Sequence, residues 1–183
     1  AGATNLRWHA TYTSNSKTAT NVANATFWWR VKSVDMAGNE SDWSDLWKVT
    51  IDNDAPVVEI TQPLEDEYLN GTVDIRGWVS DANLSHYNIA IYPGGVDVHD
   101  FSLRIEQNTE YTSEFTEKSL YTWDTTNGNF PDGEYQIRLA ARDLAGNREL
   151  NGVSEDVISV MVDNTKPSLA VNFPSEGDIL PEE

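Results

Sequence analysis

The residues best suited to chemistry in this 183-residue chain are the polar side chains of a short turn that occurs twice. Residues 35–39 read Asp-Met-Ala-Gly-Asn, and residues 143–147 read Asp-Leu-Ala-Gly-Asn. Each turn follows an alternating, strand-like run, and each leads into a second such run that ends in Asp-Asn. Carboxylate, amide and main-chain carbonyl oxygens are the ligands that Ca²⁺ prefers in proteins. The repeated turn is therefore a candidate cation site.

The two turns belong to one long internal repeat. Trp29 aligns with Ile137 at the offset of 108 residues that also relates the two turns. Trp47 aligns with Ile158 at an offset of 111 residues, as one repeat with a three-residue insertion would give. A repeat of this length indicates a string of domains.

The repeat predicts where the domains begin and end. We expect the C-terminal part of one domain in residues 1–54, a complete domain in residues 55–165, and the first strand of a third, truncated domain in residues 166–183.

The complete domain has the pattern of an all-β sandwich. Apolar and polar residues alternate with period two in Val73, Ile75 and Val79, as expected for half-buried strands. Seven runs of this kind are expected, at residues 56–61, 73–79, 87–91, 100–107, 119–126, 134–143 and 156–163. Short strands at this spacing, separated by Gly, Pro and Asn, predict two packed sheets.

The charge of the chain limits its partners. It has 30 acidic and 12 basic residues, a net charge of −18, and no cysteine. This charge argues against nucleic acid as a partner, because phosphate backbones repel acidic surfaces. No apolar run approaches the ~20 residues of a membrane span, so direct membrane insertion is not expected. Divalent cations are compatible with this charge.

The motifs resemble bacterial immunoglobulin-like and fibronectin type III-like repeats, which occur in tandem in prokaryotic surface proteins and adhesins. The likeness lies in "TWDTTNGNFPDGEYQIRLAARDLAGN", "PVVEITQP" and "FWWRVKSVDMAGNESDWS". The resemblance implies tandem seven-strand β-sandwiches, an extracellular or cell-surface location, and neighbouring immunoglobulin-like domains of the same chain as partners. It also implies calcium at domain junctions.

The strand order of such a sandwich predicts which acidic residues meet. The loop after the second strand, the repeated turn and the segment that enters the domain should all lie at its N-terminal pole. We therefore expect a Ca²⁺ site at the first junction, formed by Asp52, Asp54, Asp81, Asp143 and Asn147. The equivalent turn and the second linker offer Asp35, Asn39 and Asp163. The second linker is the weaker site, because Thr165 replaces Asp54 and Lys166 replaces Ala55.

A turn without a cation explains the same residues. Gly supplies a positive φ, and Asp and Asn side chains bond to their own backbone two residues on. At this point both interpretations of the motif stay open.

Three histidines and no cysteine give no catalytic constellation, so the chain is not expected to be an enzyme.

The tryptophans allow another function, the binding of glycans. Some tryptophans occupy the positions of the alternating pattern that face inward, and these are expected in the core: Trp29, Trp47 and Trp123. Trp28, Trp43 and Trp78 are candidate glycan contacts, since exposed aromatic rings can stack on sugars. The alternative for Trp28 and Trp43 is a cation–π stack with a nearby Arg or Lys.

The sequence thus predicts a non-catalytic extracellular stalk or spacer segment of a large cell-surface or adhesin-like protein, with junctions stiffened by Ca²⁺. Surface glycans or another cell-surface protein are further candidate partners. The alternative is an accessory or carbohydrate-binding module of a large secreted enzyme.

Overall fold

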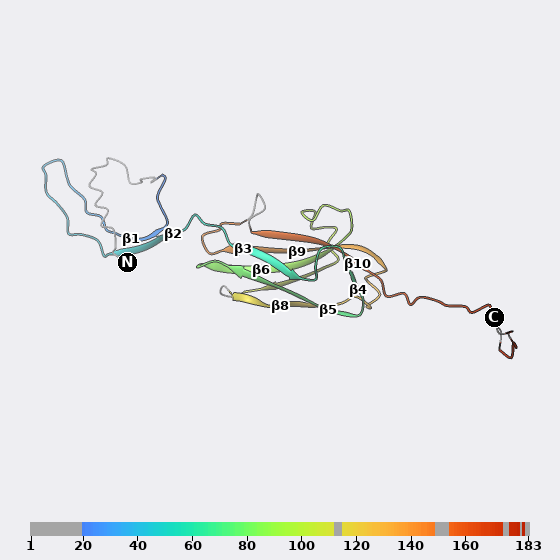
Figure 1. Cartoon of the computed structure of the whole chain (residues 1–183). Coiled ribbons are helices and arrows are strands. Elements are labelled where there is room, and N and C mark those ends of the chain that lie inside the picture. Colours follow the sequence, from blue (N-terminus) through green and yellow to red (C-terminus); the bar gives the residue numbers. More distant parts are fainter. Residues whose placement is uncertain (1–19, 112–114, 149–153, 174–175, 180, 182–183) are drawn as a thin grey trace. The chain divides into compact units, whose positions relative to one another are not determined.

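The structure is a computed structural model that describes residues 20–111, 115–148, 154–173, 176–179 and 181. The chain divides into two compact units, residues 1–53 and 54–183, and each is described by itself (Figure 1). In the described residues there is no helix long and apolar enough to cross a membrane.

In residues 20–53, the described part of the first unit, β1 (Ala25–Trp29) and β2 (Trp47–Ile51) form an antiparallel hairpin. Phe27 lies opposite Val49 and Trp29 lies opposite Trp47. Asn53 closes the end of the hairpin, because its backbone N–H and its side-chain amide both donate to Asn24 Oδ1.

The second unit is an all-β sandwich, which confirms the predicted fold class. One sheet has the order β4-β10-β9-β6-β7 and the other has the order β3-β5-β8. All neighbouring strands are antiparallel except β4 and β10, which are parallel. The strands are β3 (Val57–Gln62), β4 (Glu67–Leu69), β5 (Thr72–Ser80), β6 (Leu84–Pro93), β7 (Glu106–Glu110), β8 (Phe115–Asp124), β9 (Gly133–Asp143) and β10 (Glu155–Val162).

The described residues of this unit form eight strands, one more than the seven that the sequence predicts. The additional strand, β4, has only three residues, too few for an alternating pattern to reveal. The prediction of a strand at residues 100–107 is wrong for residues 100–105, because β7 begins only at Glu106. Asp97 and Asp100 accept hydrogen bonds from the backbone N–H groups of His99 and Ser102, so this segment forms turns until β7 begins. Such local bonds compete with the strand ladder.

The core of the second unit lies between its two sheets. Trp123 is fully buried, as expected, and packs edge-to-face against Phe130 and Tyr135. Ile75 and Ile137 are also fully buried, one from each sheet. The apolar residues that alternate along the strands therefore meet in one layer, which is the main source of stability.

Trp29 and Trp47 are not core residues, contrary to the prediction. They are 48% and 59% exposed and stack on each other with ring centroids 6.1 Å apart. Their counterparts in the second unit, Ile137 and Ile158, lie under the opposite sheet. Within the described residues of the first unit, β1 and β2 have no second sheet to cover that face.

The last hairpin of each unit has the same register. Tyr135 lies opposite Val160 and Ile137 lies opposite Ile158, at the offsets found in the sequence. Asn164 closes the second hairpin by donating its N–H to Asp132 Oδ1, as Asn53 does toward Asn24. Residues 163–173 form no strand, so the expected third domain stays a prediction, as do the other domain boundaries.

The chain passes through the second unit from one pole to the other. Val57, at the start of β3, pairs with Ser80 at the end of β5. Val162, at the end of β10, pairs with Gly133 at the start of β9, which runs toward the first pole. The N-terminal pole therefore holds residues 54–57 and 143–147, and the C-terminal pole holds residues 162–164.

Asn164 ties three segments together at the C-terminal pole. Its Oδ1 accepts a hydrogen bond from Gly71 N–H, and its Nδ2 donates to the Thr125 carbonyl. The Thr125 hydroxyl shares its single hydrogen between Asn164 Oδ1 and the Gly71 carbonyl. These bonds are part-buried, so their loss leaves polar groups unsatisfied.

The second unit should fold without the first, because its core residues all come from residues 58–162. We expect a fragment of residues 54–165 to show a β-type circular dichroism spectrum and a single cooperative melt in chelator. Trp123→Ala should lower its free energy of unfolding by about 3–5 kcal/mol, as for other buried aromatic residues. A spectrum typical of an unfolded chain for the unsubstituted fragment would contradict an independent fold.

Candidate cation site at the repeated acidic turn

The carboxylate of Asp143 is the centre of the second acidic turn. Its Oδ1 accepts hydrogen bonds from the backbone N–H groups of Gly146 at 2.6 Å and Asn147 at 2.7 Å. Its Oδ2 accepts a third from Asn147 Nδ2 at 2.7 Å. The backbone N–H of Asp143 donates to the Asn147 carbonyl, which closes the turn. Gly146 has a φ of +95°, a conformation that favours glycine.

The first acidic turn repeats this arrangement. Asp35 Oδ1 accepts from the N–H groups of Ala37 and Asn39, and Oδ2 accepts from Asn39 Nδ2. The hydrogen bond from the Asn39 side chain is the largest of the effects that hold the pKa of Asp35 below its ordinary value. Gly38 has a φ of +87°. In both copies the motif is a hydrogen-bonded turn in its own right.

The two copies differ in burial and in their neighbours. Asp143 is only 2% exposed, whereas Asp35 is exposed. The second turn also bonds to two other segments, because Leu144 N–H donates to the Asn83 carbonyl and Asn147 Nδ2 donates to the Asp54 carbonyl. The second turn therefore joins the loop before β6 and the segment before β3.

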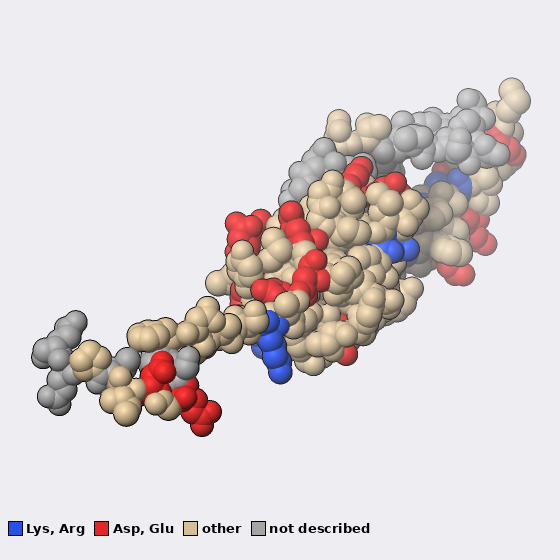
Figure 2. All heavy atoms as spheres, turned by 90° about the vertical axis from the view of Figure 1, so that its right-hand side faces the viewer, with Lys and Arg blue, Asp and Glu red and all other residues tan. Residues whose placement is uncertain are grey.

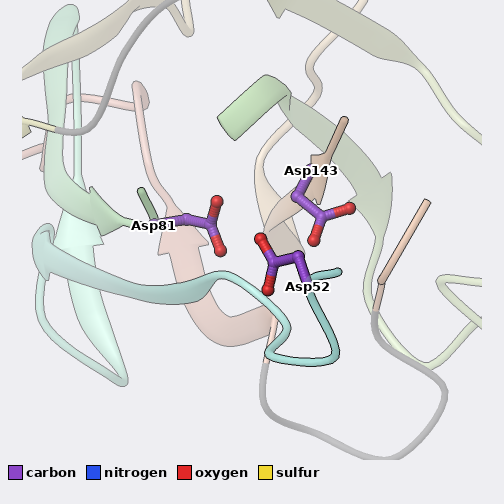
Figure 3. A group of neighbouring side chains, drawn as sticks. All are labelled: Asp52, Asp81 and Asp143. Atoms are coloured by element: carbon purple, nitrogen blue, oxygen red, sulfur yellow. The ribbon is translucent and has the colours of Figure 1, made fainter. Parts of the chain in front are cut away.

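Asp81 brings a second carboxylate to this pole. It lies in the loop between β5 and β6, where its Oδ1 accepts a hydrogen bond from Asn83 N–H. One carboxylate oxygen of Asp81 and one of Asp143 lie within 4.8 Å of each other (Figure 3). Two unit charges at that distance repel by about 1 kcal/mol in bulk water and by about 3 kcal/mol at an effective dielectric constant of 20.

The structure brings together four of the five residues predicted for the first junction. Asp54, Asp81, Asp143 and Asn147 all lie at the N-terminal pole of the second unit. Asp52, the third carboxylate drawn in Figure 3, belongs to the first unit. The chain alone limits its distance from Asp54, since two residues span at most about 7 Å.

The residues predicted for the other sites lie elsewhere. Asp35 and Asn39 stay within their own turn. Asp163 is at the C-terminal pole, where its Oδ1 accepts a hydrogen bond from Thr165 N–H. The exposed side chain of Lys166 is three residues further along the chain, so a positive charge lies close to Asp163 in the sequence.

The donor atoms at the N-terminal pole fit Ca²⁺. All of them are carboxylate, amide or carbonyl oxygens, and neither sulfur nor imidazole is among them, so Zn²⁺ fits less well. Asp143 Oδ1 already accepts two N–H groups, whereas Oδ2 accepts one. Oδ2 is therefore the atom of Asp143 that can bind a cation without loss of the turn.

Two of the three candidate glycan contacts have structural partners. The guanidinium carbon of Arg30 lies 4.4 Å from the centroid of the Trp43 ring, and Lys32 Nζ lies 5.1 Å from it. Trp43 therefore makes the cation–π stack that the sequence offered as the alternative to a glycan contact. Trp78 Nε1 donates to Glu59 Oε2 at 2.9 Å. Trp28 is 60% exposed.

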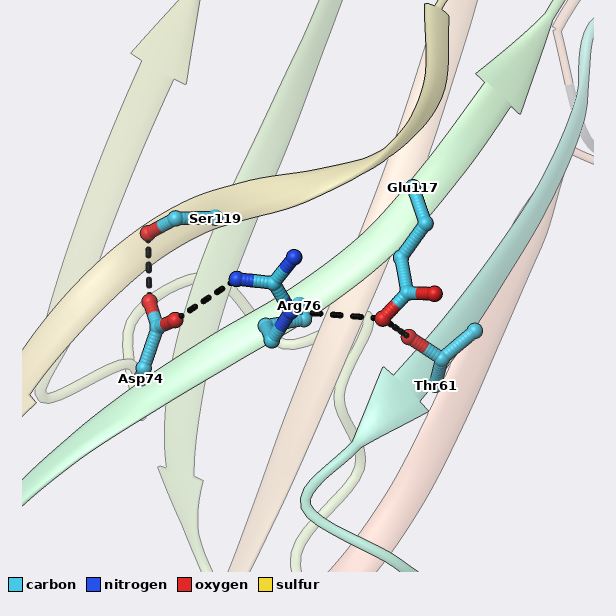
Figure 4. Close-up of polar contacts among 5 residues, drawn as sticks. All are labelled: Thr61, Asp74, Arg76, Glu117 and Ser119. Atoms are coloured by element: carbon cyan, nitrogen blue, oxygen red, sulfur yellow. Dashed lines mark hydrogen bonds and ion pairs between the residues drawn. The ribbon is translucent and has the colours of Figure 1, made fainter.

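Trp78 shares the outer face of the β3-β5-β8 sheet with a polar network that the sequence analysis missed. Arg76 lies between Asp74 and Glu117 and bonds to both, at 3.1 and 3.2 Å (Figure 4). Ser119 and Thr61 extend the network at its two ends. The Ser119 hydroxyl is the main cause, followed by Arg76, of the lowered pKa of Asp74. Alternation places Asp74 and Arg76 on the outer face, but only the strand order shows their partners.

The central role of the Asp143 carboxylate gives a direct test. In chelator, Asp143→Ala should lower the free energy of unfolding of the 54–165 fragment by roughly 3 kcal/mol, because three part-buried N–H groups lose their acceptor. The matched control, Asp163→Ala, removes one exposed hydrogen bond and should cost less than about 1 kcal/mol. Urea denaturation measures both. Equal effects would show that the turn does not depend on the buried carboxylate.

The comparison with protein families agrees with this fold. Residues 56–139 match the family model of the bacterial Ig domain. A search of the curated proteins found no match. Similar solved structures include an endo-β-1,4-mannanase from Thermotoga petrophila, 18% identical with a TM-score of 0.43, and an engineered protein, 14% identical with a TM-score of 0.40.

The alignments to these structures cover 62% and 59% of this chain, but only 21% and 20% of theirs. This chain thus spans about one fifth of the length of either structure, and the two likenesses are too weak to carry an argument. The family match covers β3 to β8 and most of β9, which supply most of the buried residues around Trp123; β10 follows the match and adds Ile158, Val160 and Val162 to the same layer. The second unit of this chain is therefore built on a bacterial immunoglobulin-like domain.

Proposed function

We propose that this chain is a non-catalytic spacer segment of an extracellular, cell-surface protein, made of tandem immunoglobulin-like domains whose first junction is stiffened by Ca²⁺. The observation that carries the proposal is the path of the chain through the second unit, from Asp54 at one pole to Asn164 at the other. A domain traversed from end to end adds its full length to a chain of domains. Bacterial Ig domains are modules of surface or secreted proteins, which supports this location.

The strands give the length that each domain would add. β9 has 11 residues, which at about 3.3 Å per residue span roughly 36 Å. The repeated hairpin register and the repeated closing bonds of Asn53 and Asn164 support the same design in both units. The neighbouring domains of the chain are therefore its first proposed partners.

The calcium site is proposed from the N-terminal pole of the second unit. Asp81 and Asp143 place carboxylate oxygens within 4.8 Å of each other, and the Asp54 carbonyl lies at the same turn. A divalent cation would remove the repulsion between the two carboxylates. Asp52 is two residues from Asp54, so the chain keeps it in reach of the same cation.

Binding through Asp52 would link the two units. Residues on both sides of the boundary at Asn53 would then share one ion, and the linker would lose conformational freedom. This is the physical basis of a stiffened junction, since an ion that binds one arrangement of the units stabilises that arrangement.

The surface charge agrees with an extracellular spacer. Figure 2 shows Asp and Glu side chains spread over the face drawn, with Lys and Arg in few places. Such a surface opposes nucleic acid and favours solubility. Another cell-surface protein remains a proposed partner, without a binding residue assigned to it, whereas surface glycans belong to the carbohydrate-binding alternative that is tested below.

Calcium binding is tested best with Asp81→Asn, which keeps an oxygen for Asn83 N–H but removes the charge. We expect the unsubstituted chain to bind Ca²⁺ with a dissociation constant of ~10⁻⁴–10⁻³ M, as extracellular modules do. At ~100 times that concentration the ion should add about 2.7 kcal/mol of stability to the state that binds it. Isothermal titration calorimetry and thermal melts measure the two effects.

A matched control variant separates the site from general charge screening. Asp163→Asn removes a carboxylate at the opposite pole and should leave the calcium response unchanged, whereas Asp81→Asn should abolish it. Small-angle scattering should show a narrower range of shapes with Ca²⁺ present. No heat of binding in the unsubstituted chain would sink the calcium site and leave the motif as a turn.

The spacer function is tested against the carbohydrate-binding alternative by affinity electrophoresis in polysaccharide gels. We expect no retardation, because Trp43 and Trp78 already have polar or cationic partners. Retardation that Trp28→Ala or Trp78→Ala abolishes would overturn the spacer function and favour the carbohydrate-binding alternative.

A further inference from the structure

We propose that Asn127 is a site of spontaneous deamidation in the folded protein, and that the fold protects Asn70 from the same reaction. Both residues precede a glycine, Gly128 and Gly71. Asn-Gly pairs react most readily because glycine has no side chain to hinder its own backbone nitrogen. A third pair, Asn151-Gly152, lies outside the described residues.

The reaction requires only water and the chain itself. The backbone nitrogen of the glycine loses its proton and attacks the side-chain Cγ of the asparagine. The new N–Cγ bond forms, the Cγ–Nδ2 bond breaks, and ammonia leaves with the added proton. Water then opens the cyclic imide at either carbonyl, which gives aspartate or its isoaspartyl isomer.

The turn at Asn127 leaves both reacting groups accessible. Asn127 and Gly128 are exposed, and a Cβ placed on Gly128 would meet no atom within 4 Å. Asn129 N–H donates to Asn127 Oδ1 at 3.1 Å. This bond polarises the amide carbonyl that is attacked and can stabilise the negative oxygen that forms there. Gly128 N–H donates no hydrogen bond to any group in the described part of the chain, so no such bond opposes the loss of its proton or its attack on Cγ.

The turn at Asn70 holds its glycine nitrogen instead. Gly71 N–H donates to Asn164 Oδ1 at 3.0 Å in a part-buried contact. The Gly71 carbonyl accepts from both the N–H and the Oγ1 of Thr125, at 3.0 and 2.9 Å. The nitrogen must leave Asn164 before it can lose its proton and attack. The bonds that close the C-terminal pole therefore also protect this asparagine.

The test compares the asparagines within one folded sample. The full chain is incubated at mildly alkaline pH, and peptide mapping by mass spectrometry follows the conversion of each amide to acid. We expect the rate at Asn127 to be at least about ten times the rate at Asn70. This factor corresponds to the free energy of the one hydrogen bond, from Gly71 N–H to Asn164 Oδ1, that must break before Asn70 can react. In urea, where both turns are lost, the two rates should become similar.

Two variants locate the cause. Gly128→Ala should slow the reaction at Asn127, because the added methyl group hinders the attack while the open space around it leaves the turn intact. Asn164→Ala should accelerate the reaction at Asn70, whereas Asn164→Asp keeps the acceptor oxygen and should not. Equal rates at the two asparagines in the folded chain, or a faster reaction at Asn70, would overturn the proposal.

Discussion

The second unit depends at its N-terminal pole on one interaction, the acceptance of three N–H groups by the buried carboxylate of Asp143. This carboxylate fixes the turn after β9, and the turn presents Asn147 to the Asp54 carbonyl and Leu144 to the Asn83 carbonyl. Three segments distant in sequence are held together in this way. A buried charge is stable only when its hydrogen bonds are satisfied, so the turn and the carboxylate require each other.

The opposite pole uses the same kind of bond with a different residue. Asn164 has both a donor and an acceptor on its side chain, and it bonds to Gly71 and Thr125 with them. Both poles are places where strands end and backbone groups lose their ladder partners, so short amide and carboxylate side chains take over. The apolar layer between the poles needs no such residues, because there the strands satisfy one another.

Much of this arrangement could be predicted from the sequence. Period-two alternation indicated the strands around Ile75 and Ile137, and the repeat offset indicated which residues of the two hairpins are equivalent. Predictions from the local alternation of residues were wrong where the structure depends on segments distant in the sequence. Alternation cannot show whether a second sheet covers Trp29, and the apolar residues of 100–107 look like a strand although Asp97 and Asp100 form turns there. The burial of Asp143 was missed because its sequence is also that of an exposed turn, as Asp35 shows.

The end-to-end path of the chain determines how the second unit would respond to tension. A pull applied at Asp54 and Asn164 acts nearly parallel to the strands, because these residues lie at opposite poles. The hydrogen bonds between β10 and β9, eight residue pairs in register, are then loaded in shear and share the force. Strands pulled from one end of a hairpin would instead separate one bond at a time. The topology therefore favours mechanical resistance along the axis in which a chain of domains is stretched.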